Sequence, residues 1–263
     1  MAPFLKWAGG KRWLFTSKFV ASLPAHNRFI EPFLGGGAAF FATKPERAIL
    51  SDVNPELISL YQVVRDDPNG VRDGLAQFQQ VHSRETYYKT RESVPESALE
   101  RAIRTLYLNR TCWNGLYRLN SMGNFNVPIG TKQQIVMAND DFAGCSQLLK
   151  RAQIICSDFE KSIDMAGDGD LLFVDPPYTV KHNMNGFVKY NESIFSWNDQ
   201  VRLHKALVKA ADRGARLIIT NADHESVRDL YYGVGQHLSV PRRSVISGIN
   251  RGRSSVTELL VTV

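Results

Sequence analysis

Short apolar runs alternate with stretches of helical periodicity along much of this chain. The apolar runs predict strands at residues 28–33, 47–52, 152–157, 170–175, 215–221 and 257–263. Amphipathic spacing predicts helices at 54–67 and 197–214, with Asn54 placed to cap the first of them. Strands separated by helices of this length are typical of a mostly parallel sheet with helices on both faces. The pattern therefore predicts an α/β fold.

One long region departs from this alternation. Between the second strand and the third, about a hundred residues carry little strand signal. The clearest helix there is at 95–110, and a loop rich in asparagine, glycine and aromatic residues follows at 111–130. We therefore expect residues 56–145 to form a mainly helical insertion, with 1–55 and 146–263 forming the α/β domain.

The composition excludes several classes of protein. Of the 263 residues 43% are hydrophobic, which suffices for one sizeable core, and no apolar run approaches the ~20 residues of a membrane span. The start lacks a signal-peptide pattern, so we expect a soluble intracellular protein. Three widely spaced cysteines and six histidines form no pair at metal-ligand spacing, so we expect no metal. Nothing points to an obligate protein partner.

The net charge of +6 becomes informative through its distribution. Two windows, 101–133 and 242–257, hold basic residues and no acidic one. Such windows suit a phosphate-facing surface, since a carboxylate there would repel the same phosphates. Two solvated basic faces explain the charge equally well. The second window overlaps residues 244–255, which we expect to form a flexible hairpin loop between late strands.

The stretch "EPFLGGGA" (31–38) is a candidate cofactor site. Three consecutive glycines between a strand and a helix let a ligand approach the backbone closely. The spacing matches neither the dinucleotide fingerprint nor the P-loop. Asp52 ends the next predicted strand, where an acid can bind ribose hydroxyls. Together these features favour an adenosine ligand without pyrophosphate, such as S-adenosylmethionine (AdoMet), over a simple tight turn.

The stretch "DPPY" (175–178) is a candidate catalytic site. Asp175 sits at the carboxyl end of a predicted strand, where ligands bind in open α/β sheets. The prolines lack N–H groups, so the turn presents two acceptors, the Asp175 carboxylate and the Pro176 carbonyl. They suit the NH2 group of a nucleobase, and Tyr178 offers a ring face for a flipped base. The alternative is a proline-terminated strand with a capping aspartate.

Two further stretches are less specific. The stretch "KWAGGKR" (6–12) is compatible with an ordinary basic turn, and nothing in it indicates a site by itself. The loop "TCWNGLYRLNSMGNFNV" (111–127) combines an aromatic residue, an asparagine and an arginine, the groups that wedge between bases, pair with adenine and bind guanine. A structured Asn/Gly loop is an equally good interpretation of these residues alone.

Taken together, these motifs resemble the Dam family of DNA adenine-N6 methyltransferases, which modify GATC. The resemblance runs nearly end to end: "FLKWAGGK", "EPFLGGGA", "SDVNPELISLY", "LYLNR", "NGLYRLN", "GNFNVPIG", "DPPY" and "RRSVISGINRGRSSVTELL" occur in the family's order. The order of cofactor motif, recognition insertion and catalytic motif is that of the alpha class of amino-methyltransferases. The resemblance implies a Rossmann-like AdoMet-dependent fold with a helical recognition insertion.

The resemblance also implies roles for individual residues. Those assigned to AdoMet are Trp7, Lys11, Phe33, Gly35, Gly37, Asp52, Asp158, Phe159 and Asp175. Those that would orient the target adenine are Asp175, Pro176 and Tyr178. In the loop, Trp113 would fill the gap left by the flipped base. Those that would read the GATC bases are Asn114, Leu116, Arg118 and Pro128, with Arg118 assigned to guanine.

Some loop positions depart from the family pattern. Trp113 stands where tyrosine or phenylalanine is common, Thr111 and Cys112 replace a glycine-containing pair, and Tyr117 and Leu119 also differ. We expect AdoMet-dependent methylation of adenine N6 in double-stranded DNA by base flipping and direct transfer. The alternatives are another planar NH2 group, in cytosine, RNA or a protein amide, or a DNA-binding regulator without catalysis.

Overall fold

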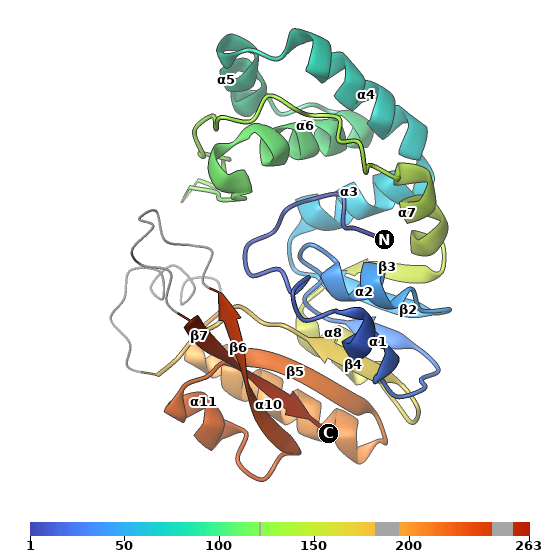
Figure 1. The fold of residues 1–263 in the computed structure, drawn as a ribbon, viewed down its shortest axis with the longest axis vertical. Helices are drawn as coiled ribbons and strands as arrows, with labels where there is room; N and C mark the ends of the chain where they lie inside the picture. The colour runs from blue at the N-terminus through green and yellow to red at the C-terminus, as the bar shows by residue number, and fades with distance from the viewer. Residues whose placement is uncertain (121, 182–194, 244–254) are drawn as a thin grey trace. The chain divides into compact units, whose positions relative to one another are not determined.

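The computed structural model describes residues 1–120, 122–181, 195–243 and 255–263 (Figure 1). In these residues one sheet has the strand order β3-β2-β1-β4-β5-β7-β6. Its strands are β1 (Phe29–Glu31), β2 (Ala48–Asp52), β3 (Ala152–Cys156), β4 (Leu171–Val174), β5 (Arg216–Ala222), β6 (Gln236–Arg243) and β7 (Ser255–Thr262). The six predicted strands are therefore confirmed, each to within a few residues.

The sheet is mostly parallel with an antiparallel end. β1 pairs in parallel with β2 and β4, and β4 pairs in parallel with β5. β7 is antiparallel to both β5 and β6. All four residues of β4 are buried, as continuous apolar runs in parallel sheets usually are. The order and direction of the strands confirm the predicted α/β fold.

The pattern of apolar residues did not predict β6. In its sequence, "QHLSVPRR", polar residues alternate with single apolar ones and a proline follows. Among the described strands it pairs with β7 alone. Proline is tolerated at such an edge because its missing N–H faces away from the ladder. An edge strand needs no apolar run, so periodicity could not reveal it.

The chain divides into two compact units. Unit 1 comprises Met1–Ala21, Leu34–Glu46 and Asp52–Cys156; unit 2 comprises Ser22–Phe33, Arg47–Ser51 and Ser157–Val263. The helices of unit 1 are α1 (Ser17–Ala21), α2 (Ala38–Thr43), α3 (Pro55–Asp66), α4 (Pro68–Val81), α5 (Arg84–Glu92), α6 (Ala98–Thr111), the short 3-10 turn η1 (Trp113–Gly115) and α7 (Phe142–Leu149). Those described in unit 2 are α8 (Phe159–Asp164), α10 (Trp197–Asp212) and α11 (Glu225–Leu230).

The expected split into a domain of 1–55 with 146–263 and an insertion of 56–145 stays a prediction. The described part of 56–145 is mainly helical. The contacts, however, group the N-terminal segment and the glycine turn with these helices. No helix in the described residues is long and apolar enough to cross a membrane.

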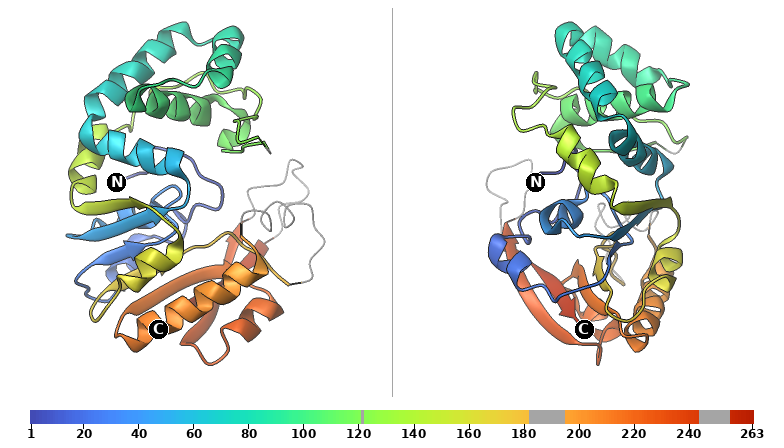
Figure 2. Two further views of the ribbon diagram at one scale, coloured as in Figure 1. Left: turned by 180° about the vertical axis from the view of Figure 1, so that it is seen from behind. Right: turned by 90° about the vertical axis from the view of Figure 1, so that its right-hand side faces the viewer.

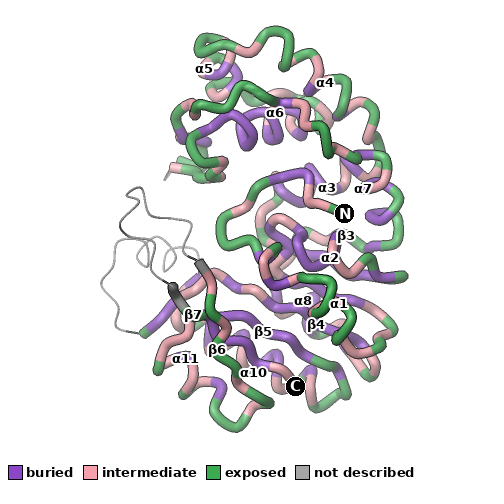
Figure 3. Tube along the Cα trace, in the orientation of Figure 1, coloured by how far each residue is buried: buried purple, intermediate pink, exposed green. Residues whose placement is uncertain are grey.

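Local signals explain where the main helices begin. The Asn54 side chain accepts hydrogen bonds from the backbone N–H groups of Glu56 and Leu57, which confirms it as the cap of α3. Ser196 and Asp199 form a capping box at the start of α10. In unit 1, α3 packs on α6, which is buried over most of its length (Figure 3). In unit 2, α10 packs on β5 and α8 (Figure 2).

Candidate active site

The glycine turn between β1 and α2 is held from two sides. The Gly35 N–H donates to Asp52 Oδ2 at 3.0 Å, and the Tyr61 hydroxyl donates to the Gly35 carbonyl at 3.0 Å. Gly35 and Gly37 have φ angles of 46° and 64°, a region that favours glycine. The turn and the acid that ends β2 are therefore directly joined.

Trp7 packs against this turn. A Cβ on Gly35 would lie 2.8 Å from Trp7 Cδ1, and one on Gly36 would lie 3.1 Å from Trp7 Cβ. Only glycine allows so close an approach at Gly35. Lys11 from the same motif is buried, and its Nζ donates to the Gly9 carbonyl at 2.7 Å. Unit 1 thus brings Trp7, Gly35 and Asp52 together, as the cofactor hypothesis requires.

The Asp52 carboxylate is poised to accept further hydrogen bonds. It accepts from the Gly35 N–H through Oδ2 and from the Asn54 N–H through Oδ1. Each carboxylate oxygen has two acceptor positions, so capacity remains for hydroxyl donors. Burial raises the pKa of Asp52, and the backbone N–H donors partly counteract that rise.

Unit 2 gathers three aromatic rings that include two predicted residues. Phe33 stacks on Phe159 with centroids 5.4 Å apart, and Phe195 contacts both rings at 5.6 and 5.7 Å. The guanidinium of Arg202 lies over Phe159, 4.9 Å from its centroid. No motif pointed to Phe195 or Arg202. Phe195 follows no recognisable pattern, and Arg202 resembles any polar residue on an amphipathic helix.

The Asp158 carboxylate is already engaged in this unit. It caps α8 by accepting from the Glu160 N–H, and it accepts from Arg202 Nη2 at 3.0 Å. Arg202 also pairs with Glu160 and Asp199, and these carboxylates raise its pKa further. Arg202 therefore fixes the side chains at the start of α8.

The Asp-Pro-Pro-Tyr segment follows β4 and is anchored to two other strands. The Thr220 hydroxyl of β5 donates to Asp175 Oδ1 at 2.8 Å. The Tyr178 hydroxyl donates to Glu258 Oε2 of β7 at 2.8 Å. Burial and the charges of Asp175 and Glu258 raise the pKa of Tyr178, so its hydroxyl stays protonated and donates. Pro176 is buried.

Sequence reasoning missed Glu258, although a signal was present. Glu258 is a charged residue inside "TELLVTV", an otherwise apolar strand run, and it is buried. Buried charged residues are rare unless they are paired, so such a residue marks a specific interaction. Periodicity alone predicts a strand at this run and assigns no role to its acid.

The candidate DNA-reading residues share one surface property. All five candidates in the loop after α6 are exposed: Trp113, Asn114, Leu116, Arg118 and Pro128. Trp113 keeps 53% of its surface exposed, which is unusual for so large an apolar ring. The Arg118 Nε donates to Asn126 Oδ1 at 3.0 Å, so the side chain is oriented from within the loop.

The base of this loop is tied to the N-terminal motif. Asn109 is buried at the end of α6, where it accepts from the Lys6 N–H at 2.9 Å and donates to the Lys6 carbonyl at 2.8 Å. Next to this clamp, the rings of Trp7 and Tyr117 stack with centroids 5.2 Å apart. Trp7 therefore contacts both the glycine turn and the loop.

Three arginines of the two basic windows bind groups within the protein, which neither interpretation of the windows anticipated. Arg110 is buried and pairs with Asp140, with an N–O distance of 2.6 Å. Arg104 donates to the carbonyls of Thr90 and Arg91. Arg242 pairs with Glu258 at 2.8 Å. These arginines bind carbonyls and acids within the protein. The partners lie outside the two windows in the sequence. The predicted loop at 244–255, apart from Ser255, lies outside the described residues.

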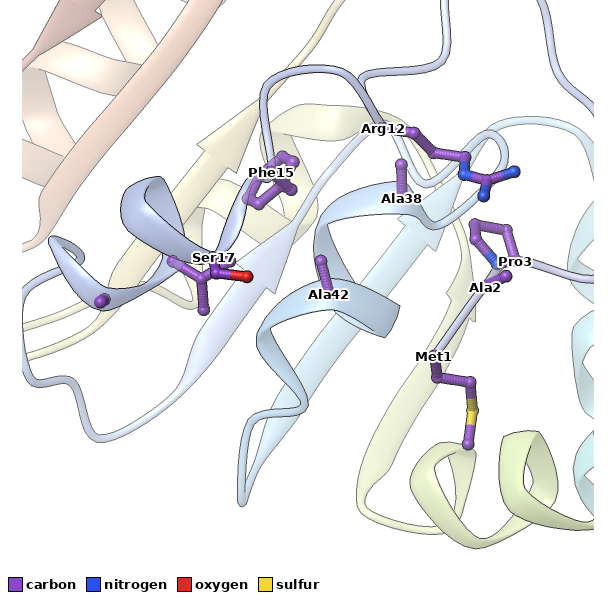
Figure 4. A pocket seen from close by; sticks show the side chains of 10 residues that line it. Met1, Ala2, Pro3, Arg12, Phe15, Ser17, Ala38 and Ala42 are labelled. Atoms are coloured by element: carbon purple, nitrogen blue, oxygen red, sulfur yellow. The ribbon is translucent and has the colours of Figure 1, made fainter.

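A separate cavity of about 630 Å³ lies in unit 1 (Figure 4). It is lined by Met1, Ala2, Pro3, Arg12, Phe15, Ser17, Val20, Ala21, Ala38 and Ala42. None of these is a candidate site residue. The lining holds no carboxylate that could bind ribose hydroxyls, so the cavity does not fit the predicted cofactor. Among the described side chains no cluster of histidine, cysteine or acidic residues is arranged to hold a metal.

The mostly parallel sheet, the glycine turn after β1, the acid ending β2 and the Asp-Pro-Pro-Tyr segment after β4 together define a Rossmann-like methyltransferase. A family model of D12 class N6 adenine-specific DNA methyltransferases matches residues 7–246. The chain belongs to this family. It is therefore an adenine-specific DNA methyltransferase, as the resemblance implied.

Individual relatives agree with this assignment. The chain is 34% identical to the type II methyltransferase M1.LlaDCHI of Lactococcus lactis subsp. cremoris, over 100% of this chain and 95% of the relative. It is 34% identical to the DNA adenine methylase of Serratia marcescens, over 98% and 96%. It is 36% identical to the DNA N-6-adenine-methyltransferase of Escherichia phage P1, over 94% of this chain and 34% of that longer protein.

Proposed function

We propose that this enzyme transfers the methyl group of AdoMet to N6 of an adenine that is flipped out of double-stranded DNA, within the sequence GATC. The observation that carries the chemistry is the Asp175 carboxylate, which Thr220 holds directly after β4. Because the substrate is DNA, we expect the enzyme to act inside the cell. We also expect that it needs no obligate protein partner.

The residues of the Asp-Pro-Pro-Tyr segment suit an amine nucleophile. The Asp175 carboxylate and the Pro176 carbonyl would accept the two N6 hydrogens, which localises the nitrogen lone pair. AdoMet would supply the methyl group from its sulfonium and depart as a neutral thioether, and N6, held by Asp175 and Pro176, would release one proton to solvent after the transfer. Most of the acceleration would come from positioning, which can contribute ~7–11 kcal/mol. Tyr178 would supply the face on which the flipped adenine stacks.

AdoMet fits the residues present in unit 1. It supplies an electrophilic methyl group on a positively charged sulfur. Asp52 retains acceptor capacity for ribose hydroxyls, and a Cβ at Gly35 would crowd the turn. In unit 1 we also assign Trp7, Lys11 and Gly37 to AdoMet binding. In unit 2 we assign Phe33, Asp158 and Phe159 to it.

The GATC assignment rests on the loop. Trp113 is exposed and would fill the space of the flipped base. Arg118 is exposed and oriented by Asn126, and an arginine reads guanine through O6 and N7. We assign Asn114, Leu116 and Pro128 to the remaining base contacts.

A methyl-transfer assay tests the proposal. The enzyme is incubated with labelled AdoMet and a duplex that contains one unmethylated GATC site, and nucleosides are then analysed. We expect N6-methyladenine, no product from a duplex with a scrambled site, and no product from Asp175→Ala. Sequencing of methylated sites after expression in a methylation-free host checks specificity. Methylation outside GATC would refute the specificity, and absence of N6-methyladenine would refute the chemistry.

A further inference from the structure

Three side chains project from the same face of neighbouring strands beside the Asp-Pro-Pro-Tyr segment. Glu258 of β7 pairs across with Ala222 of β5 and Val240 of β6. Directly opposed residues share a face, and so do residues two positions apart along a strand. Thr220 and Arg242 each lie two positions from those partners. Thr220, Glu258 and Arg242 therefore share one face across β5, β7 and β6.

The Glu258 carboxylate in the middle of this row is desolvated and doubly engaged. Its side chain is 4% exposed, and that of Arg242 is 17% exposed. Oε1 lies 2.8 Å from Arg242 Nη1, and Oε2 accepts the Tyr178 hydroxyl at 2.8 Å. A buried carboxylate is costly unless it is paired, so the ion pair with Arg242 offsets the desolvation of Glu258 and holds its side chain in place.

We propose that Glu258, held by Arg242, is a positioning residue that fixes the ring of Tyr178 for the target base. A tyrosine ring swings about its Cα–Cβ bond, and a hydrogen bond at its far end restrains that swing. The anchor is a strand paired on both sides, which is more rigid than a loop. Thr220 holds Asp175 in the same way from β5. The inference rests on the proposed role of Tyr178.

The tests separate positioning from stability. Tyr178→Phe keeps the ring and removes the hydroxyl. Arg242→Met combined with Glu258→Leu replaces the buried pair by apolar side chains, which is often tolerated, whereas Glu258→Leu alone leaves an unpaired arginine. Glu258→Gln keeps an acceptor for the tyrosine. Asp170→Asn is the matched control, because Asp170 is equally buried in an ion pair with Arg28 in the same unit.

We measure kcat, KM for DNA, the AdoMet dissociation constant, the melting temperature, and the fluorescence of 2-aminopurine placed at the target adenine. We expect Tyr178→Phe and the Met/Leu double variant each to lower kcat roughly 10- to 100-fold, as misplacement of reacting groups does, with AdoMet affinity unchanged. The 2-aminopurine signal should change in both. Glu258→Gln should recover most of the loss, and Asp170→Asn should change only the melting temperature.

The decisive measurement combines Tyr178→Phe with the Met/Leu replacement. If Glu258 acts through the tyrosine hydroxyl, the triple variant is no slower than Tyr178→Phe alone. The positioning role would be overturned if the separate losses in kcat multiply in the triple variant, or if the Met/Leu variant keeps the wild-type kcat. Either result would leave the proposed function intact. Absence of methyl transfer by the wild-type enzyme would overturn the proposed function, and the positioning role with it.

Discussion

Arg110 provides a sharp test of how the basic residues of this chain are used. It lies in a window without acidic residues, where charge alone suggests a phosphate contact. In the structure its side chain is 1% exposed and makes four hydrogen bonds in unit 1. Two reach the Asp140 carboxylate at 2.6 and 2.8 Å, and two reach the carbonyls of Ile135 and Phe4 at 2.6 and 2.9 Å. We therefore predict that Arg110→Met changes stability and not DNA affinity.

The size of the effect follows from the groups that lose their partner. Removing one member of a buried ion pair costs ~3–5 kcal/mol, because the other charge stays desolvated. Two buried carbonyls also lose a charged donor, although water that reaches Asp140, 11% exposed, relieves part of the cost. We expect a loss of about 4 kcal/mol. At ~2–4 °C per kcal/mol for a chain of this size, the melting temperature falls by about 10 °C.

Urea unfolding and DNA titration at several salt concentrations check this prediction. Arg110→Met should lower the free energy of unfolding, and Arg110→Met combined with Asp140→Leu should recover much of it. The slope of log affinity against log salt should stay unchanged at temperatures where the variant is folded, whereas losing one phosphate contact lowers it by ~1. Unchanged stability together with a reduced slope would refute the internal role of Arg110.

Three further predictions concern the candidate site. Gly35→Ala should weaken AdoMet binding in calorimetry at least ~10-fold, because φ is 46° and its Cβ would lie 2.8 Å from Trp7; Gly167→Ala, with open space around it, is the control, and equal affinities would contradict the turn's role. Burial raises the pKa of Asp52, so its carboxylate takes up a proton, and loses an acceptor position, at a pH above the usual range for aspartate. AdoMet affinity should therefore fall as pH decreases through that raised pKa, and Asp52→Asn should be weaker with a flatter pH profile; a wild-type profile as flat as that of the variant would contradict this. Asp175→Ala should abolish turnover in the labelled-AdoMet assay yet bind DNA in a gel-shift assay, since its carboxylate serves the chemistry, and residual turnover near wild type would refute its role.

The sequence predicted the fold well where a single segment carried enough signal. The runs that became β2, β4 and β5 are buried on both faces over most of their length, and Asn54 caps α3 as its position indicated. The apolar pattern did not predict β6, because an edge strand does not need an apolar run. The helices α4 and α5 were not located individually because their apolar stripes are narrow, with two buried residues each.

The motifs of the candidate site can be found in the sequence, but the residues that hold those motifs in place cannot. Asp175, Gly35 and Asp52 stand at or just after strand ends that the pattern located, and their residue types at those places made them candidates. Their partners Thr220 and Tyr61 lie in different elements, 45 and 26 residues away, and nothing in one sequence pairs them. Such contacts are set by tertiary packing, which periodicity does not record.

The internal arginines show why net charge overstates a DNA-binding surface. Arg110, Arg104 and Arg242 are three of the nine basic residues in the two windows, yet each binds carbonyls or a carboxylate within the protein. Arg118 is different, because it is exposed. Within the described part of the loop its guanidinium donates to the neutral side chain of Asn126. A guanidinium with spare donors and no counter-charge can bind a guanine edge, whereas one that neutralises a buried acid cannot leave it without exposing that charge to a low dielectric. The role of each arginine is therefore set by whether internal carbonyls or acids fold against it. The acids in question, Asp140 and Glu258, lie outside the windows that made the sequence look uniformly basic.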